Sequence, residues 1–378
     1  MEWQSKTDGR QEQGQGSILS GWDSSSWSGR THGSTKRKVG HRSDDERLSF
    51  NRQLKPHGYQ WWYIDAISED QSYSLSMIIF VGHVFSPYYY KARQRELNDL
   101  KLRPESFCAF NISLHALNKS AVNQLGSPSL WVLNEYSAEA LALSPELIKR
   151  DQHCFKINQS MWHQSDDEIT ISINEVTKAF FQRMSNKIIG QVQLKLPRRF
   201  HHEINLDHTG KHKWMAVAPS ADVVVSLEQP NLSFRGQAYH DSNWGDEPLE
   251  NAFKSWTWSR AELNEGTCVL YDINEHGKDV NPRALFFSHQ GTVEELDKKF
   301  VSSSLPKGLW GVHRPNRADH SDLAHLHKTL VDSPLYTRDL VHTELLGEKT
   351  LAMYESLNLH RFEQSWVRFL LPFRIRRW

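Results

Sequence analysis

The sequence predicts an all-β protein built from two β-barrel or β-sandwich units. Short runs of alternating large and polar residues recur along the chain, and turn-forming residues separate them, a pattern typical of antiparallel β-structure. Helical periodicity is confined to residues 138–149 and the C-terminus. A chain of 378 residues is long enough for two domains or one large β domain, and the number of predicted strands favours two.

The predicted strands begin with an aromatic run at residues 59–66, which a polar turn joins to a second strand as a hairpin. The period of two is clearest at residues 169–173, where Ile alternates with Thr and Ser. Residues 213–219 and 222–227 predict another hairpin, and a longer loop over the sheet begins at residues 86–90. The predicted strands span residues 59–66, 73–82, 107–117, 129–137, 154–163, 168–176, 187–196, 213–219, 222–227, 253–261, 267–274, 284–289, 293–300, 309–312, 335–346 and 350–357.

The two ends of the chain differ from its middle. Residues 1–44 are poor in aliphatic residues and rich in Ser, Gly and Gln, which predicts a disordered tail. Two β domains are expected at residues 45–247 and 248–357. Residues 358–378 alternate aromatic and aliphatic residues with Arg. This last segment either packs on the barrel as a short helix or lies in a membrane interface.

Composition excludes several functional classes. The 45 acidic and 45 basic residues balance, so no global field favours nucleic acid. Cys108, Cys154 and Cys268 lie far apart and are expected to be buried free thiols in a reducing compartment, without a zinc site. The histidines of residues 201–212 match no metal-ligand spacing and are expected at the surface. No run reaches the roughly 18 apolar residues of a membrane span, and no secretory signal is present, which predicts a cytoplasmic location.

Polar and aromatic side chains that could take part in a reaction are most concentrated in residues 236–245, which run Gly-Gln-Ala-Tyr-His-Asp-Ser-Asn-Trp-Gly. Residues 254–260 and 269–272 contain further side chains of these kinds. Two interpretations stay open. Such residues are good turn formers. They also bring an acid, an imidazole and an amide next to aromatic rings, which suits general acid chemistry. Gly236 and Gly245 suggest bulges or tight bends that aim these groups at a ligand.

Four segments carry a family signature: residues 58–66, residues 214–219, residues 236–245 with 256–260 and 271–272, and residues 355–357 with 370–374. In order and spacing they resemble the carotenoid 1,2-hydratases (hydroxyneurosporene synthases), part of a wider superfamily of two-domain lipocalin-like proteins. The match runs from about residue 48 to the C-terminus. The resemblance implies two lipocalin-like domains. The chain departs from it at Ser242, where family members often have a second histidine.

The resemblance implies a reaction that adds water across the terminal 1,2 double bond of an acyclic carotenoid such as neurosporene or lycopene, without a cofactor. The chain agrees, because it contains no dinucleotide fingerprint and no P-loop. An acid must protonate C2, the cation at C1 must be shielded, and water must reach it. A carboxyl group can donate a proton only if burial raises its pKa.

Asp241 and Asp272, each beside aromatic residues, are the candidates for this acid. Asp241 is favoured as the proton donor, with His240 as its hydrogen-bond partner or proton source. Asp272 and Tyr271 would then hold the water and accept its proton, and the opposite assignment stays open. The aromatic candidates for contact with the cation or the polyene, each of which could instead be plain core packing, are Trp61, Trp62, Tyr63, Tyr239, Trp244, Trp256 and Trp258.

The implied partners are the carotenoid and water, with peripheral contact at the inner (photosynthetic) membrane through the basic, aromatic C-terminus. Two competing functions fit the same architecture. One is a polyene cyclase or Diels–Alder-type enzyme, and the other is a non-enzymatic carotenoid or lipid carrier. Replacing Asp241 or Asp272 by Asn should abolish hydration, only weaken a pericyclic enzyme and scarcely affect a carrier.

Overall fold

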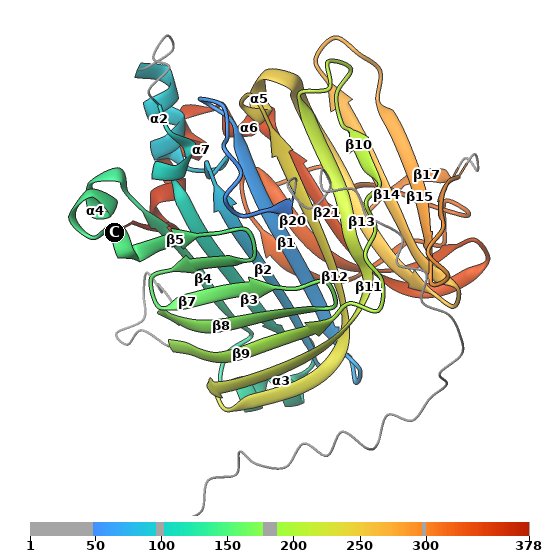
Figure 1. Cartoon of the computed structure of the whole chain (residues 1–378). Coiled ribbons are helices and arrows are strands. Elements are labelled where there is room, and N and C mark those ends of the chain that lie inside the picture. Colours follow the sequence, from blue (N-terminus) through green and yellow to red (C-terminus); the bar gives the residue numbers. More distant parts are fainter. Residues whose placement is uncertain (1–47, 96–101, 177–186, 297–299, 378) are drawn as a thin grey trace, which may run out of the picture. The chain divides into compact units, whose positions relative to one another are not determined.

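The computed structural model describes residues 48–95, 102–176, 187–296 and 300–377, and most of them lie in antiparallel β-strands (Figure 1). The prediction of an all-β protein is therefore confirmed. The tail predicted at residues 1–44 lies outside the described residues. Cys108 and Cys268 are buried free thiols as expected, whereas Cys154 is only half-buried.

The described strands up to residue 245, joined by β22 from the C-terminus, form a large curled sheet in the order β22-β4-β3-β2-β1-β12-β11-β9-β8-β7-β6-β5, with β10 against β11. In Figure 1, β7, β8 and β9 cross the direction of β2, β3 and β4, and side chains from both groups form one hydrophobic core. The strands are β1 (Tyr59–Ser68), β2 (Tyr73–Val81), β3 (Cys108–Ala116), β4 (Ser129–Tyr136), β5 (Ile148–Arg150), β6 (Cys154–Ile157), β7 (Ser160–Gln164), β8 (Glu168–Val176), β9 (Lys187–Lys195), β10 (Glu203–Asn205), β11 (His212–Gln229), β12 (Leu232–Gly245) and β22 (Arg376–Arg377).

The second sheet has the order β16-β15-β14-β13-β21-β20-β19, and β17 pairs separately with β18. All strands of the second sheet follow residue 252. The last strand of the chain, β22, pairs with β4 and therefore belongs to the first sheet. The described residues, from 48 onward, belong to one compact unit, so the domain boundary at residue 247 stays a prediction. The strands are β13 (Phe253–Leu263), β14 (Gly266–Glu275), β15 (Asn281–Ser288), β16 (Val293–Glu295), β17 (Val301–Ser304), β18 (Pro315–Ala318), β19 (His325–Asp332), β20 (Tyr336–Leu345) and β21 (Glu348–Asn358).

Short helices connect the strands. The loop expected at residues 86–90 is wrong, because helix α2 begins at Pro87, a favourable first helical residue. The helix expected at residues 138–149 stops early: Pro145 cannot continue it, and the chain passes through a 3₁₀ turn into β5. The helices are α2 (Pro87–Arg95), α3 (Lys119–Leu125), α4 (Ala138–Leu143), α5 (Leu249–Ala252), α6 (Leu359–Phe362) and α7 (Ser365–Leu370), with 3₁₀ turns η2 (Pro104–Ser106), η3 (Pro145–Leu147) and η4 (Leu371–Phe373).

Strand β1 explains why the aromatic run lacks polar alternation. Successive side chains of a strand point to opposite faces. Trp62 and Ile64 enter the core inside the curled sheet, whereas Trp61 and Tyr63 enter a second core shared with β13, β14 and β21. Both faces of β1 are buried, so both sets of residues are large and apolar. The second core joins the two sheets.

Strand β11 corrects the predicted hairpin at residues 213–227. The segment is one long strand, and its register against β12 shifts between Ala216 and Ala218 and again between Ala218 and Ala221. Pro219 lies within the second shift, where its missing N–H group costs no ladder hydrogen bond. What looked like a turn in the sequence is therefore a bulged strand.

Strand β12 corrects the turn interpretation of residues 236–245. These residues form a continuous strand that pairs with β1 on one side and with β11 on the other. Gly236 is needed for close approach, because a Cβ atom there would lie 2.0 Å from the backbone oxygen of Ile67. The register shifts lie opposite, in β11, so neither glycine marks a bend in β12 itself.

Candidate active site

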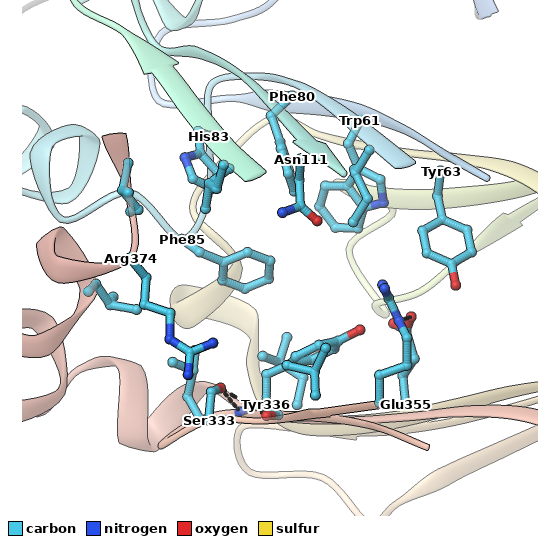
Figure 2. Close-up of a pocket in the computed structure, with 18 of the residues that line it drawn as sticks. Trp61, Tyr63, Phe80, His83, Phe85, Asn111, Ser333, Tyr336, Glu355 and Arg374 are labelled. Carbon is cyan, nitrogen blue, oxygen red and sulfur yellow. Dashed lines mark hydrogen bonds and ion pairs between the residues drawn. The ribbon is translucent and has the colours of Figure 1, made fainter. Parts of the chain in front are cut away.

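A cavity of about 640 Å³ lies between the inner faces of the two sheets and has mostly aromatic and aliphatic walls (Figure 2). Its polar lining residues are His83, Asn111, Asp241, Asn243, Tyr63, Tyr271, Ser333, Tyr336, Arg338, Glu355 and Arg374. A large apolar cavity with a few convergent polar groups is the usual form of a small-molecule site.

Strand register builds one wall of the cavity. Asp241 on β12 pairs with Tyr63 on β1, and two residues further on Asn243 pairs with Trp61 on β1 and with Trp214 on β11. Because side chains two apart share a face of a strand, all five point to the same side of the sheet. The wall is thus a polar pair, Asp241 and Asn243, set among aromatic rings.

The opposite wall is a row across the second sheet. Trp258 on β13 pairs with Tyr271 on β14 and with Glu355 on β21, and Glu355 pairs with Arg338 on β20. Ring contacts bring this row to the first wall: Trp258 lies 5.6 Å from the ring of Tyr63. Tyr271 likewise lies 5.7 Å from the ring of Trp214, measured between ring centroids.

Asp241 is buried, and burial raises the pKa of its carboxyl group to about 8. Trp214 Nε1 donates a hydrogen bond to Oδ2 over 2.8 Å, and the Tyr239 hydroxyl donates to the same oxygen over 3.0 Å. These two bonds favour the charged form, and desolvation outweighs them. Oδ1 has no hydrogen-bond partner among the described residues. Since Oδ2 already accepts two hydrogen bonds, the proton of the neutral acid belongs on Oδ1.

Glu355 forms an ion pair with Arg338, whose Nε donates to Oε1 over 2.8 Å. The Arg338 guanidinium lies 5.4 Å from the ring centre of Tyr63 and 5.6 Å from that of Tyr336, and it also donates to the Ser76 hydroxyl of β2. Figure 2 shows Tyr63 and Glu355 reaching toward each other from opposite walls. This ion pair is the charged part of the otherwise aromatic end of the cavity.

The other end of the cavity contains His83, Phe85 and Arg374 (Figure 2). His83 Nδ1 lies 2.9 Å from Glu135 Oε2, in a buried pair beside the cavity. Trp310 and Phe373 line this cavity and are also exposed, so the cavity reaches the surface at the C-terminal segment.

Comparison with known proteins identifies the family of this chain. The sequence profile described as carotenoid hydratase CrtC matches residues 77–378. The chain belongs to this carotenoid hydratase family. It is 35% identical to the acyclic carotenoid 1,2-hydratase of Thiocapsa roseopersicina over 329 residues, covering 87% of this chain and 75% of that one. It is 32% identical to the hydratase of the same name from Rubrivivax gelatinosus, with the same coverage.

A solved structure shows the fold shared by this family member. A putative AttH from Nitrosomonas europaea superposes with a TM-score of 0.51 at 11% sequence identity, covering 87% of this chain and 99% of that one. The lipocalin-like architecture expected from the sequence is therefore confirmed.

Six of the site residues predicted from the sequence line the cavity of this member of the carotenoid hydratase family: Trp61, Tyr63, Asp241, Trp256, Trp258 and Tyr271. Tyr239 lies directly behind them, since its hydroxyl donates to Asp241 and its ring lies 5.1 Å from that of Trp258. These seven residues come from β1, β12, β13 and β14.

The structure does not bring His240 to Asp241. The two are neighbours on β12 and point to opposite faces. His240 Nδ1 lies 2.9 Å from the backbone oxygen of Tyr63, and its ring packs 5.7 Å from Trp162 in the other core. Burial lowers the pKa of His240 to about 4, so it is neutral. Ser242 lies on the same face of β12 as His240 and donates a hydrogen bond to the Trp61 carbonyl. The position at which this chain has Ser instead of the family histidine is therefore outside the cavity.

Asp272, Trp62 and Trp244 also lie outside the cavity lining. Asp272 follows Tyr271 on β14 and therefore faces the other way, where Arg317 Nε donates to its Oδ2 over 2.9 Å. Trp62 donates to the Leu48 carbonyl inside the curled sheet. Trp244 packs in a small buried cluster under the Arg52 guanidinium.

Sequence reasoning missed several cavity residues. Trp214, Asn243 and Glu355 lay within the segments that carry the family signature, and their positions in those segments were the available signal. Arg338 and Asn111 lay in no such segment, and only strand pairing reveals them. Among the described residues, no group of three His, Cys, Asp or Glu side chains could hold a metal ion.

Proposed function

We propose that this chain is a carotenoid 1,2-hydratase, which adds water to the terminal 1,2 double bond of an acyclic carotenoid without a cofactor. The observation that carries the proposal is Asp241, a carboxyl group kept neutral at about pH 7 in an aromatic cavity. Membership of the carotenoid hydratase family and the names of the relatives support the reaction and the substrate class.

Asp241 acts in this proposal as the proton donor. Trp214 and Tyr239 hold Oδ2, which fixes the carboxyl plane and leaves Oδ1, without a hydrogen-bond partner among the described residues, to carry the transferable proton. Protonation of C2 places the positive charge on the tertiary carbon C1. Once its proton has left, the Asp241 carboxylate is stabilised by the same two hydrogen bonds.

The aromatic walls shield the cation at C1 in this proposal. Trp61, Tyr63 and Trp258 line the cavity next to Asp241 and offer π faces that attract a cation without reacting with it. Such an attraction is worth about 2 kcal/mol when the site is desolvated. Water then adds to C1 and gives a tertiary alcohol.

The cavity mouth supports peripheral contact with the membrane that stores the substrate, which we propose to be the inner photosynthetic membrane. Trp366 stacks on Trp310 and Phe369 packs on Phe373, and all four side chains are exposed. Arginines of the same segment would meet anionic headgroups. In the part of the chain that the structure describes, no helix is both long and apolar enough to span a bilayer.

Point substitutions test this contact better than removal of the C-terminus, because β22 pairs with β4 and Ile375 is buried. The double variant Trp366→Ser with Phe369→Ser is expected to sediment at least tenfold less with phosphatidylglycerol vesicles than the wild type, since each ring loses roughly 2 kcal/mol of burial. Leu143→Ser, at another exposed apolar residue, is the control. Equal sedimentation of the double variant and the wild type would contradict membrane contact at this mouth.

The reaction is tested by expressing the chain in a host that makes lycopene or neurosporene. Mass spectrometry should detect a carotenoid that has gained one water, and NMR should place the hydroxyl group on C1. A cyclised isomer of unchanged mass would favour the cyclase alternative. Bound but unchanged pigment would favour a carrier.

A further inference from the structure

Resting on the proposed hydration, we infer that Glu355 is the base that takes the proton from the attacking water. The hydration has two proton transfers, and Asp241 accounts for the first. The water that captures the cation at C1 must lose a proton to become the alcohol. A second carboxylate facing the cation would accept that proton directly.

The lining of the cavity limits the choice of base. Among the described residues that line it, the carboxyl groups are those of Asp241 and Glu355. Asp272, which the sequence favoured for this role, faces the other side of β14 and does not line the cavity. Glu135 lies behind His83 and pairs with it and with Arg377. Glu355 is therefore the carboxylate that water in the cavity can reach.

The position of Glu355 fits the geometry of addition. It lies on β21 in the second sheet, whereas Asp241 lies on β12 in the first, so the two carboxyl groups belong to opposite walls. They are near enough that the charge of Glu355 contributes to the raised pKa of Asp241. A flat cation between the walls would receive its proton from one face and its water from the other.

The contacts of Glu355 suit a base. The side chain is 16% exposed although it stands in the middle of a sheet, because it borders the cavity. Arg338 binds Oε1 and fixes the carboxylate, and its guanidinium is held in turn by the rings of Tyr63 and Tyr336. The negative charge also faces the place where the cation forms, which stabilises that cation.

The steps balance. The O–H bond of Asp241 breaks, and the π electrons of the terminal double bond form the new C2–H bond. A lone pair of water forms the C1–O bond, one water O–H bond breaks, and Glu355 takes the proton. The enzyme is left with Asp241 ionised and Glu355 protonated. Proton exchange with solvent restores both groups.

Hydrogen isotope exchange separates this role from a structural one. In D₂O, Glu355→Gln is expected to lose hydration by roughly 10²- to 10⁴-fold, the usual effect of removing a general base. Asp241 still donates its deuteron to C2, which then carries this deuterium beside its original hydrogen. When the cation returns to the alkene, the Asp241 carboxylate takes that original hydrogen as a proton, so the C2–H bond breaks, the C2–D bond stays and recovered carotenoid carries deuterium at C2. Asp241→Asn is expected to show neither alcohol nor label.

Three further measurements complete the test. Glu295→Gln removes a carboxylate from an ion pair with Arg283 outside the cavity and should hydrate like the wild type. Glu355→Asp keeps a carboxylate and should hydrate faster than Glu355→Gln, which remains informative if the Gln variant folds poorly. Thermal unfolding of each variant checks the fold.

Each outcome separates the two proposals. Hydration by Glu355→Gln within about threefold of the wild type would overturn the role of Glu355 and leave the proposed function standing. Loss of both alcohol and label in a folded Glu355→Gln variant would also overturn it. A wild-type protein that forms no alcohol would instead refute the hydratase function itself.

Discussion

The two faces of strand β12 carry the same kinds of residue and have different tasks. Tyr239, Asp241 and Asn243 face the second sheet, where the cavity lies. His240 and Ser242 face the other way and bind the β1 carbonyls of Tyr63 and Trp61. Residues adjacent in sequence are therefore separated by the full thickness of a sheet. A polar cluster in a strand must be divided by its period of two before roles are assigned.

The largest expected contrast between the faces is between Asp241 and His240. Asp241→Asn removes the transferable proton and should lower the hydration rate by at least about 10³-fold, consistent with the loss of an essential general acid. His240→Gln can still bond the Tyr63 carbonyl and should stay within about threefold of the wild type. Rates are measured as alcohol formed from lycopene in detergent micelles. Comparable losses in both variants would mean that the division by faces does not govern the chemistry.

A second contrast concerns two tryptophans on opposite sides of the cavity boundary. Trp258→Leu removes a π face from the cavity wall and should slow hydration about 30-fold, which corresponds to about 2 kcal/mol of cation stabilisation. Trp244→Leu alters a separate buried cluster and should lower the melting temperature by several degrees with little change in rate. Steady-state rates at a temperature where both variants are folded distinguish the two effects. An equal rate loss would remove the case for a cation contact at Trp258.

These contrasts show which features of the fold and of the site can be predicted from the sequence. The all-β class, most strands and the presence of Asp241 and Trp258 at one site follow from alternation and family signature. The pairing of β21 with β13 does not, and that pairing is what brings Glu355 beside Trp258 from almost 100 residues away in the chain. Asp241 and Asp272 looked equivalent in sequence because each lies within two residues of a tyrosine. Only the direction of each side chain, set by register, separates a neutral acid from a partner of Arg317.

The smallest expected effect is one of pH, and it concerns Asp241 alone. Its pKa is raised to about 8, so the proton-donating form persists at neutral pH. Hydration should therefore fall about tenfold per pH unit above about 8, and by roughly tenfold at pH 9.

The same shift has a consequence for stability. Because the folded pKa lies above the unfolded value of about 3.9, the protonated carboxyl group favours the folded state, and this contribution is lost as the pH rises from about 4 to about 8. Asp241→Asn cannot ionise, so its stability relative to the wild type should increase across that window. Chemical denaturation of both proteins at about pH 5 and pH 9 measures the difference. A constant difference, together with a rate that does not decline above pH 8, would show that Asp241 is already ionised at neutral pH and cannot be the acid.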